Sequence, residues 1–442
     1  MDDFRDLADV LAADIRTGRL RPGDRLPTQR RFARDRGVAV STASRVYREL
    51  VRRGLAVGEV GRGTFVRAGR PDPGPALAEP ATARVDLELN FPLLPDQSQL
   101  LARALDGLLR ADALDAGMQP MTASATAAAR AAAAAALTRT GWSPDPGCIR
   151  FTGNGRQAIA AAIAALVPVG ERLGVEALTY PVVRGIAARL GVELVPLAMD
   201  ADGLRPDALA AAGPLRAVYL QPTLHNPLGV TMPAARRAEL AGALDELDLP
   251  AIEDTINAFL RDDEPPLAAV APERTVLVDS LSKRIGPGLT TGFVVPPPRL
   301  LGPIEVAVRG GGWTAQRFAV EAASRWITDG VLATIVAAKR ADAAHRQRLA
   351  GERLSGFSLR ADPSAYHCWW ELPAPWRADT FVAAASRRGI AVTPAAAFAV
   401  GNGHAPNAVR LALASPPLPV LDTALDTLAA LARTAPGDDG TE

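Results

Sequence analysis

The sequence predicts an α/β protein in which a small winged helix-turn-helix precedes a larger domain with a mainly parallel central sheet. Residues 1–68 contain three amphipathic helical stretches followed by a short hairpin pattern. From residue 86 to residue 438, strand-like apolar runs alternate with Ala- and Leu-rich helical stretches, which is typical of βαβ units. Residues 69–85 are rich in Pro, Gly and Ala, and are predicted to form a linker between the two domains.

The helices of the first domain are predicted from their apolar faces and their capping residues. The first helix places one apolar row on a single face, formed by Phe4, Leu7, Val10, Leu11 and Ile15. Thr28 is expected to cap a second helix, which ends at Gly37, and Ser41 or Thr42 is expected to begin a third helix. The residues of the third helix that are predicted to face inward are Ala43, Val46, Tyr47, Leu50 and Val51.

The end of the first domain has the pattern of a wing. Gly54 is expected to stop the third helix, and the runs LAVGEV and TFVR then flank a glycine-rich turn at 61–63. In a winged helix-turn-helix, the third helix lies in the major groove of DNA, and Arg62 at the tip of the wing can reach a minor groove or a phosphate.

The charge distribution favours DNA as the partner of this domain. The net charge of +1 conceals 16 Arg against 9 acidic residues in the stretch 1–70, while the remainder carries −6. Arginine binds guanine and phosphate, and hydroxyl side chains donate to phosphate. A solvated arginine face would have the same composition, so the prediction depends on the helix order and the wing as well. The candidate DNA-binding residues are Thr28, Arg30, Ser41, Thr42, Ser44, Arg45, Arg48 and Arg62.

Several classes of protein are disfavoured by composition. The acidic start MDDFRDLADV does not resemble a signal peptide, and no run of 18 apolar residues predicts a membrane span. A cytoplasmic location is therefore expected. The two Cys and four His are scattered, which predicts neither a disulfide framework nor a metal site.

Lysine is rare in this chain, and its position is informative. Only Lys283 and Lys339 are lysines among the 49 basic residues. A lysine amine forms a Schiff base with an aldehyde, whereas arginine does not. Lys283 follows the strand-like run TVLVDSL, so it is the candidate for this chemistry.

Other polar residues also follow predicted strands. Asn226 comes after the run YLQP and Asp254 ends the run AIED, and the carboxyl ends of parallel strands form ligand crevices. An aspartate can hold a pyridine nitrogen protonated, and an asparagine can bind a phenolic oxygen. The turn TGNGRQAIA opens a helix whose backbone N–H groups can bind a phosphate. The candidate phosphate-binding residues are Gly155, Arg156, Gln157, Ser280 and Ser282.

The order of these elements resembles the class I/II aminotransferases, of fold type I among pyridoxal phosphate proteins. The resemblance covers residues 88–435 and implies a smaller C-terminal α+β subdomain. It implies that Lys283 forms the Schiff base with pyridoxal 5'-phosphate, that Asp254 pairs with the pyridinium nitrogen, and that Asn226 binds the phenolic oxygen. Tyr180 matches the residue that stacks on the ring, although an ordinary loop aromatic has the same local pattern. Arg410 matches the arginine that binds a substrate carboxylate, although a solvated arginine at a strand edge is the alternative.

The first domain resembles the GntR-type winged-helix repressors. The matching runs are PGDRLPTQR (22–30), GVAVSTASRVYREL (37–50) and GRGTFV (61–66), and Val40 stands where many members have a basic residue. The two resemblances together match the MocR subfamily of transcription regulators. This implies a homodimer that binds a DNA operator and senses an amino acid or amine through pyridoxal phosphate.

Two departures keep other functions open. Ile256 stands where the aminotransferases usually have a tyrosine, and Thr290 stands where they usually have an arginine for the phosphate. Arg284 or Arg156 is a candidate replacement for that arginine. One alternative function is an active pyridoxal phosphate-dependent aminotransferase. The other is a cofactor-free dimer scaffold that carries a DNA-binding head.

Overall fold

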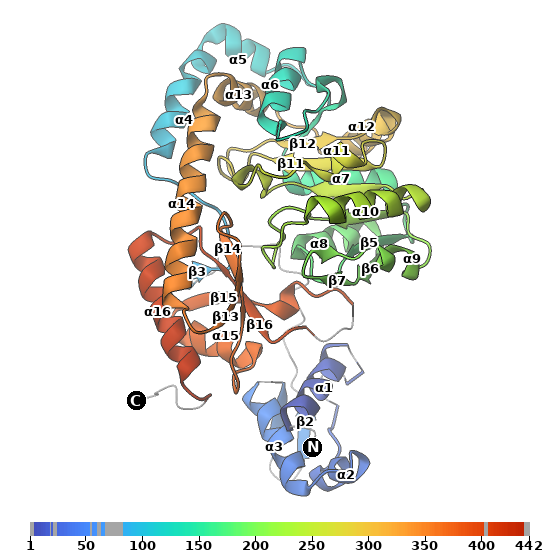
Figure 1. The fold of residues 1–442 in the computed structure, drawn as a ribbon, viewed down its shortest axis with the longest axis vertical. Helices are drawn as coiled ribbons and strands as arrows, with labels where there is room; N and C mark the ends of the chain where they lie inside the picture. Colours follow the sequence, from blue (N-terminus) through green and yellow to red (C-terminus); the bar gives the residue numbers. More distant parts are fainter. Residues whose placement is uncertain are drawn as a thin grey trace. The chain divides into compact units, whose positions relative to one another are not determined.

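The computed structural model forms two compact units, which Figure 1 shows in blue and in light blue to red. It describes residues 4–17, 19–20, 24–53, 55–59, 63–66, 83–401 and 405–436. The first unit contains the N-terminal helices and hairpin, and the second contains the strands and helices from Val85 onward.

The first unit has the element order of a winged helix-turn-helix. Helices α1 (Phe4–Arg16), α2 (Gln29–Asp35) and α3 (Val40–Arg52) are followed by the antiparallel strands β1 (Ala56–Glu59) and β2 (Gly63–Val66). Tyr47 on α3 lies at the centre of the core. Its ring packs edge-on against Phe32 of α2, and its hydroxyl donates to the carbonyl of Pro27 at 2.5 Å. One side chain therefore links the two helices and the segment that precedes α2.

One helix start and one inward-facing residue of this unit were predicted wrongly. The Thr28 hydroxyl accepts a hydrogen bond from the N–H of Arg31, so the predicted cap of α2 is confirmed. Helix α3 begins at Val40 after Ala39, so Ser41 and Thr42 lie in its first turn and do not cap it. Val51 is 45% exposed because its neighbour Leu50 occupies the inward position of the helix. The predicted helix stop at Gly54 and the tip of the wing lie outside the described residues.

The second unit is built on a seven-stranded sheet with the order β4-β12-β11-β10-β9-β5-β6. Strand β12 is antiparallel to both of its neighbours, and the other strands run parallel to one another. The prediction of a mainly parallel sheet is therefore confirmed. In sequence order, the strands are β4 (Arg150–Thr152), β5 (Arg172–Glu176), β6 (Glu193–Leu197), β9 (Ala217–Leu220), β10 (Ala251–Asp254), β11 (Thr275–Ser280) and β12 (Gly292–Val295).

Helices cover both faces of this sheet because successive strand residues point to opposite sides. Tyr219 and Ile252 pack with the residues of one face, whereas Val218 and Leu220 pack with those of the other. The first face is covered by α7 (Gly155–Leu166), α8 (Pro181–Leu190) and α12 (Leu301–Gly310). The second face is covered by α9 (Asp207–Ala211), α10 (Ala234–Glu246) and α11 (Leu267–Val270). Further helices pack beside β4 and β12, namely α4 (Gln97–Leu105), α6 (Ala127–Leu137) and α13 (Arg317–Thr328), while α5 (Ala111–Gly117) packs against α13.

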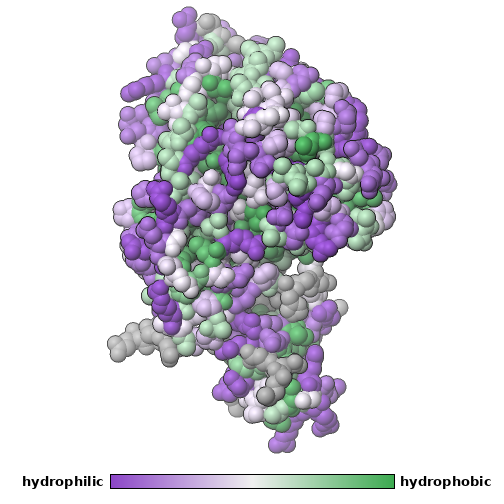
Figure 2. Space-filling model, in the orientation of Figure 1, coloured by the Kyte–Doolittle hydropathy of each residue, from purple (hydrophilic) through white to green (hydrophobic). Residues whose placement is uncertain are grey.

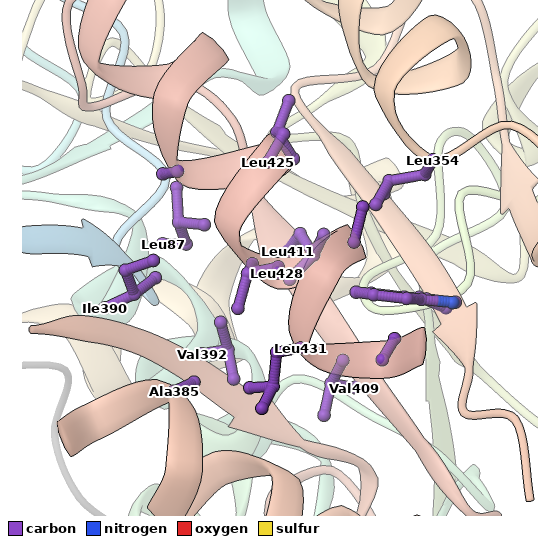
Figure 3. Close-up of a cluster of buried hydrophobic side chains, with 14 of the residues drawn as sticks. Leu87, Leu354, Ala385, Ile390, Val392, Val409, Leu411, Leu425, Leu428 and Leu431 are labelled. Atoms are coloured by element: carbon purple, nitrogen blue, oxygen red, sulfur yellow. The ribbon is translucent and has the colours of Figure 1, made fainter. Parts of the chain in front are cut away.

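A second sheet of five strands has the order β13-β14-β16-β15-β3. Its strands are β3 (Val85–Leu87), β13 (Ser358–Ala361), β14 (His367–Glu371), β15 (Ile390–Pro394) and β16 (Ala408–Ala412). Val85, the last residue of the predicted linker, therefore begins a strand. Residues 69–82 of that linker lie outside the described residues. One face of the sheet packs against α14 (Val331–Arg353), α15 (Ala378–Arg387) and α16 (Leu418–Arg433), and Figure 3 shows part of this core.

The alternation of side chains along β16 determines which way Arg410 points. Val409 and Leu411 belong to the core under α16, as Figure 3 shows. Arg410 lies between them and therefore points to the opposite face of the second sheet. There it meets Asn226, which follows β9 of the first sheet. The two sheets thus meet at a polar contact.

Within the described residues, no helix is both long enough and apolar enough to cross a bilayer. Figure 2 shows hydrophilic and hydrophobic residues intermixed on the visible face of the molecule.

The core under α16 gives the first testable prediction. Leu428 is fully buried, so Leu428→Ala is expected to lower the free energy of unfolding by about 2–5 kcal/mol through lost burial and a residual cavity. Val420 lies on the same helix and is 40% exposed, so Val420→Ala serves as the control. Chemical denaturation followed by circular dichroism measures both. Equal losses in the two variants would contradict the placement of this core.

Candidate functional site

Lys283 lies in the loop that follows β11, at the carboxyl end of the sheet. Its side chain is half-buried, and its Nζ is 6.0 Å from the centre of the Phe91 ring. Burial, together with the positive charge of Arg410, lowers the pKa of Lys283 to about 8, and Asp254 opposes the shift. A lysine with this pKa is substantially neutral just above pH 8, and a neutral amine is the nucleophile that Schiff-base chemistry requires.

Asp254 is buried at the end of β10 and is held by three donors. The Tyr219 hydroxyl and the Gln221 amide donate to Oδ2 at 2.6 Å and 2.8 Å, and the N–H of Ile256 donates to Oδ1 at 3.0 Å. Burial raises the pKa of Asp254, and these hydrogen bonds counteract that shift. The carboxylate is therefore positioned and partly stabilised beside Lys283.

The sequence did not single out Tyr219 or Gln221 as site residues. Tyr219 is a buried tyrosine in the strand AVYL, and Gln221 follows the last residue of the same strand. Both residues reach Asp254 because β9 and β10 are neighbours in the sheet, where Tyr219 pairs in register with Ile252. Which strands are neighbours is a property of the tertiary structure, and the sequence order alone does not provide it.

Asn226 and Arg410 come from different sheets and bind each other. The Arg410 guanidinium donates to the Asn226 side-chain oxygen at 3.2 Å, to the Thr393 hydroxyl at 3.0 Å and to the carbonyl of Glu88. It also lies over the Phe398 ring. Burial lowers the pKa of Arg410 to about 10, which leaves it a cation at neutral pH. A solvated arginine at a strand edge, the alternative considered from the sequence, is thus wrong.

Tyr180 lies near the same residues. It immediately precedes α8 and is half-buried. Burial raises the pKa of Tyr180, and the nearby guanidinium of Arg156, which is hydrogen-bonded to it, counteracts this shift. Asp254 and Arg410 also influence this pKa, so the phenol belongs to the same electrostatic cluster as Lys283.

The N-terminus of α7 supplies backbone donors beside a row of hydroxyls. The Asn154 side chain accepts from the N–H of Gln157. The N–H groups of Gly155 and Arg156, which also lie in the first turn of the helix, have no acceptor among the described residues. A Cβ at Gly155 would lie 3.0 Å from the Ser280 hydroxyl, so glycine permits this close approach. Ser280 donates to Ser282 at 3.1 Å, and Ser282 is 2.9 Å from the Thr290 hydroxyl.

These residues fit pyridoxal phosphate. The free N–H groups at the start of α7 and the adjacent hydroxyls are suited to a phosphate. Arg410 Nε is buried and has no partner within the described part of the chain, so an anionic group can complete its hydrogen bonds. Asp254 is held in place and can pair with a pyridinium nitrogen. The predicted site residues of the second unit are thus linked by direct contacts or by electrostatic interactions.

Comparisons with known proteins identify the families that the two units match. Residues 86–428 match the family model described as aminotransferase class I and II, and residues 5–66 match the bacterial regulatory proteins of the gntR family. The chain belongs to the class I and II aminotransferase family. With its GntR-type domain, it has the domain organisation of the MocR-type regulators.

Individual relatives and one solved structure are similar to most of the chain. The chain is 28% identical to an uncharacterized HTH-type transcriptional regulator, YdeF of Bacillus subtilis, covering 93% of this chain and 90% of that protein. It is 26% identical to the vitamin B6 salvage pathway transcriptional repressor PtsJ of Salmonella typhimurium, covering 96% of each. The structure matches an archaeal alanine:glyoxylate aminotransferase with a TM-score of 0.72 at 22% identity, covering 79% of this chain and 90% of that one. This last similarity shows the fold alone.

Thr290 and the two arginines that were predicted as candidate phosphate ligands lie in different surroundings. Thr290 contributes a hydroxyl to the row with Ser282. Arg284 was considered as a replacement phosphate ligand, but it is buried and donates to Asp279 at 2.6 Å and 2.9 Å and to the Ser280 carbonyl. Its guanidinium therefore makes its hydrogen bonds inside the protein and does not replace the phosphate arginine. Arg156, half-buried beside Tyr180, stays a candidate.

The GntR-type unit exposes most of the predicted DNA-binding residues. Thr28, Arg30, Ser41, Arg45 and Arg48 are exposed, whereas Thr42 and Ser44 are half-buried. The Arg45 guanidinium lies 4.0 Å from the centre of the Phe4 ring, which orients its side chain across α1. Arg62 lies outside the described residues. Val40 is 49% exposed at the start of α3.

The electrostatics around Lys283 give the second prediction. The rate of its reaction with an amine-directed reagent is expected to rise with pH and to reach half its maximum near pH 8, because only the neutral amine reacts. Arg410→Met is expected to raise this midpoint and Asp254→Asn to lower it, since each variant removes one of the named charges. Peptide mass spectrometry measures the modification site by site.

Lys339 provides an internal control for that experiment. It is fully buried, so it is expected to react far more slowly than Lys283 in the folded protein. A Lys283 midpoint near the ordinary lysine pKa of about 10.4 in the unsubstituted protein would contradict the described burial of this amine.

Proposed function

We propose that this chain is a DNA-binding transcription regulator whose aminotransferase-like unit binds pyridoxal phosphate covalently through Lys283 and senses an amino acid or amine. The main support is a half-buried lysine whose pKa is lowered to about 8 and which interacts electrostatically with a buried aspartate and a buried arginine. The same chain carries an arginine-rich, GntR-type unit. A relative named as a vitamin B6 salvage pathway repressor also supports the proposal.

The residues around Lys283 would each hold one part of the cofactor. Asp254 would keep the pyridine nitrogen protonated, Asn226 would bind the phenolic oxygen, and Tyr180 would contact the ring. Gly155, Arg156, Ser280 and Ser282 surround the position for the phosphate, where Gln157 contributes less because its N–H is bound to Asn154. When bound, pyridoxal phosphate supplies a carbonyl carbon at which one amine can be exchanged for another.

Arg410 is the proposed recognition point for an effector carboxylate. Its Nε lacks a partner in the described structure, while Nη1 donates to Asn226 and Nη2 donates to Thr393 and to the Glu88 carbonyl. An effector amine would displace the Lys283 amine, while a carboxylate would occupy the free Nε position. Displacement of Lys283 changes the charge at the centre of the unit. Operator affinity would respond if the two states of this loop favour different arrangements of the heads.

The operator would be bound by two copies of the first unit. We propose a homodimer because a single recognition helix contacts a short half-site, and a dimer doubles the contacts. The exposed arginines at positions 30, 45 and 48 supply phosphate and base contacts.

Slow transamination is a second candidate function of the same site. It is favoured by the grouping of Lys283, Asp254 and Arg410, which provides a nucleophile, a pyridinium partner and a carboxylate ligand. Ile256 offers only its backbone N–H to Asp254, so the usual tyrosine contact of the family is missing. We infer that turnover is slow and that sensing is the main role.

Cofactor binding gives the third prediction. The purified protein is expected to develop a visible absorption band with pyridoxal phosphate, and Lys283→Ala and Lys283→Arg are expected to lack it, since neither offers a lysine amine. Lys283→Arg retains the positive charge and is the matched control for electrostatic binding. Absorption spectroscopy after removal of free cofactor measures the band. A band of equal intensity in Lys283→Arg would rule out Lys283 as the attachment point.

DNA binding gives the fourth prediction. With random-sequence duplex DNA, Arg48→Ala is expected to weaken binding and to reduce the slope of log affinity against log salt by about 1, as for one lost phosphate contact. Arg19 is paired with Asp14 in the same unit, so Arg19→Ala is the control and is expected to change the slope little. Fluorescence anisotropy at several salt concentrations measures both slopes. Identical slopes in wild type and Arg48→Ala would remove Arg48 from the interface.

A further inference from the structure

Lys339, the second lysine of the chain, lies next to the first. It is fully buried on α14, and its Nζ donates to the backbone carbonyl of Lys283 at 2.9 Å and to that of Ile285 at 3.2 Å. Gln97 of α4 donates to the same Ile285 carbonyl at 2.6 Å. The loop that carries Lys283 is therefore held from two helices that are far from it in sequence.

The hydrogen bonds of Lys339 match a neutral amine. An ammonium group has three N–H donors, whereas the described residues offer Nζ two acceptors, both of them carbonyls. The charged group in closest electrostatic contact is Asp342, whose carboxylate already accepts from Arg346 at 2.8 Å and from Tyr366 at 2.9 Å. Burial lowers the pKa of Lys339 to about 7, and Asp342 opposes the shift.

We propose that Lys339 is a positioning residue that fixes the backbone at Lys283 and so couples the cofactor lysine to helix α14. The amine acts through two carbonyls and does not touch the cofactor position. Lysine stands at this fully buried position in a chain whose basic residues, apart from Lys283, are otherwise all arginine.

Helix α14 connects the Lys283 loop to the second sheet. The helix packs against α13 and α4 beside the first sheet and against α16 beneath the second, and Figure 1 shows it extending along both. Tyr366, just before β14, donates to the backbone carbonyl of Lys339 at 2.9 Å. A displacement of the Lys283 backbone would therefore reach α14 and the start of β14, an inner strand of the second sheet, through hydrogen bonds.

The proposal rests on the proposed function only in taking Lys283 as the lysine that binds the cofactor. The position of the Lys283 backbone does not require the cofactor, so the proposal is tested without it. Because the chain has two lysines, protein labelled with [13Cε]lysine gives two lysine signals, and Lys283→Ala assigns them. Titration by NMR then reads both pKa values in the full-length protein. In Lys339→Met, the loop loses two hydrogen bonds and is expected to admit water to the Lys283 amine. The pKa of Lys283 is therefore expected to rise from about 8 toward the ordinary value.

Gln347→Met is the matched control. Gln347 is also buried on α14, is neutral, and donates through one nitrogen to two backbone carbonyls, those of Ala365 and His367, at 2.7 Å and 2.8 Å. It does not touch the Lys283 loop, so the Lys283 pKa is expected to stay unchanged in this variant. An unchanged Lys283 pKa in folded Lys339→Met would overturn the proposal, as would an equal shift in Gln347→Met.

The wild-type protein provides a test that needs no Lys339 variant. The Lys339 signal is expected to titrate near pH 7. A midpoint near the ordinary lysine value of about 10.4 would mean that Lys339 Nζ is exposed to water instead of buried against the Lys283 loop, which also overturns the proposal. Loss of cofactor binding with both titrations as expected would instead count against the proposed function alone.

Discussion

The burial of Asp254 is the constraint on which the rest of the site depends. A carboxylate removed from water needs donors, and the structure provides them from the neighbouring strand through Tyr219 and Gln221. The Gln221 side chain then accepts from the backbone N–H of Asn226 at 3.2 Å, and the Asn226 side chain accepts from Arg410. One buried charge thus sets the positions of a glutamine, an asparagine and an arginine from two different sheets.

Different residues of the same site leave a polar group open and hold the surrounding backbone in place. Among the described residues, Arg410 Nε is buried without a hydrogen-bond partner, while the surroundings of the site are held by buried groups that face inward, such as Arg284 and Lys339. Arg284 pairs with Asp279 under the loop, and Lys339 binds the loop carbonyls from the side of α14. A rigid backbone around a lysine with a lowered pKa favours exchange of amines at one defined position.

Much of the fold was predictable because apolar period and turn residues are local properties. The strands that carry Asp254 and precede Lys283, the cap at Thr28 and the winged helix order all follow from such patterns. The start of α3 and the exposure of Val51 were predicted wrongly, because one residue of helix rotation moves a side chain by about 100°. The roles of Tyr219, Gln221 and Lys339 were not predictable, since each depends on a neighbour distant in sequence.

The sequence by itself determined the two units, the family and the candidate residues Lys283, Asp254, Asn226 and Arg410, because these are carried by short local motifs. Only the tertiary structure decided what those residues touch. It placed Arg410 against Asn226 on the face of β16 that points away from α16, and it brought Lys339 to the Lys283 backbone. The physical reason is that strand order and helix packing join segments 184 residues apart in the first contact and 56 residues apart in the second, and local patterns carry no information on such pairs.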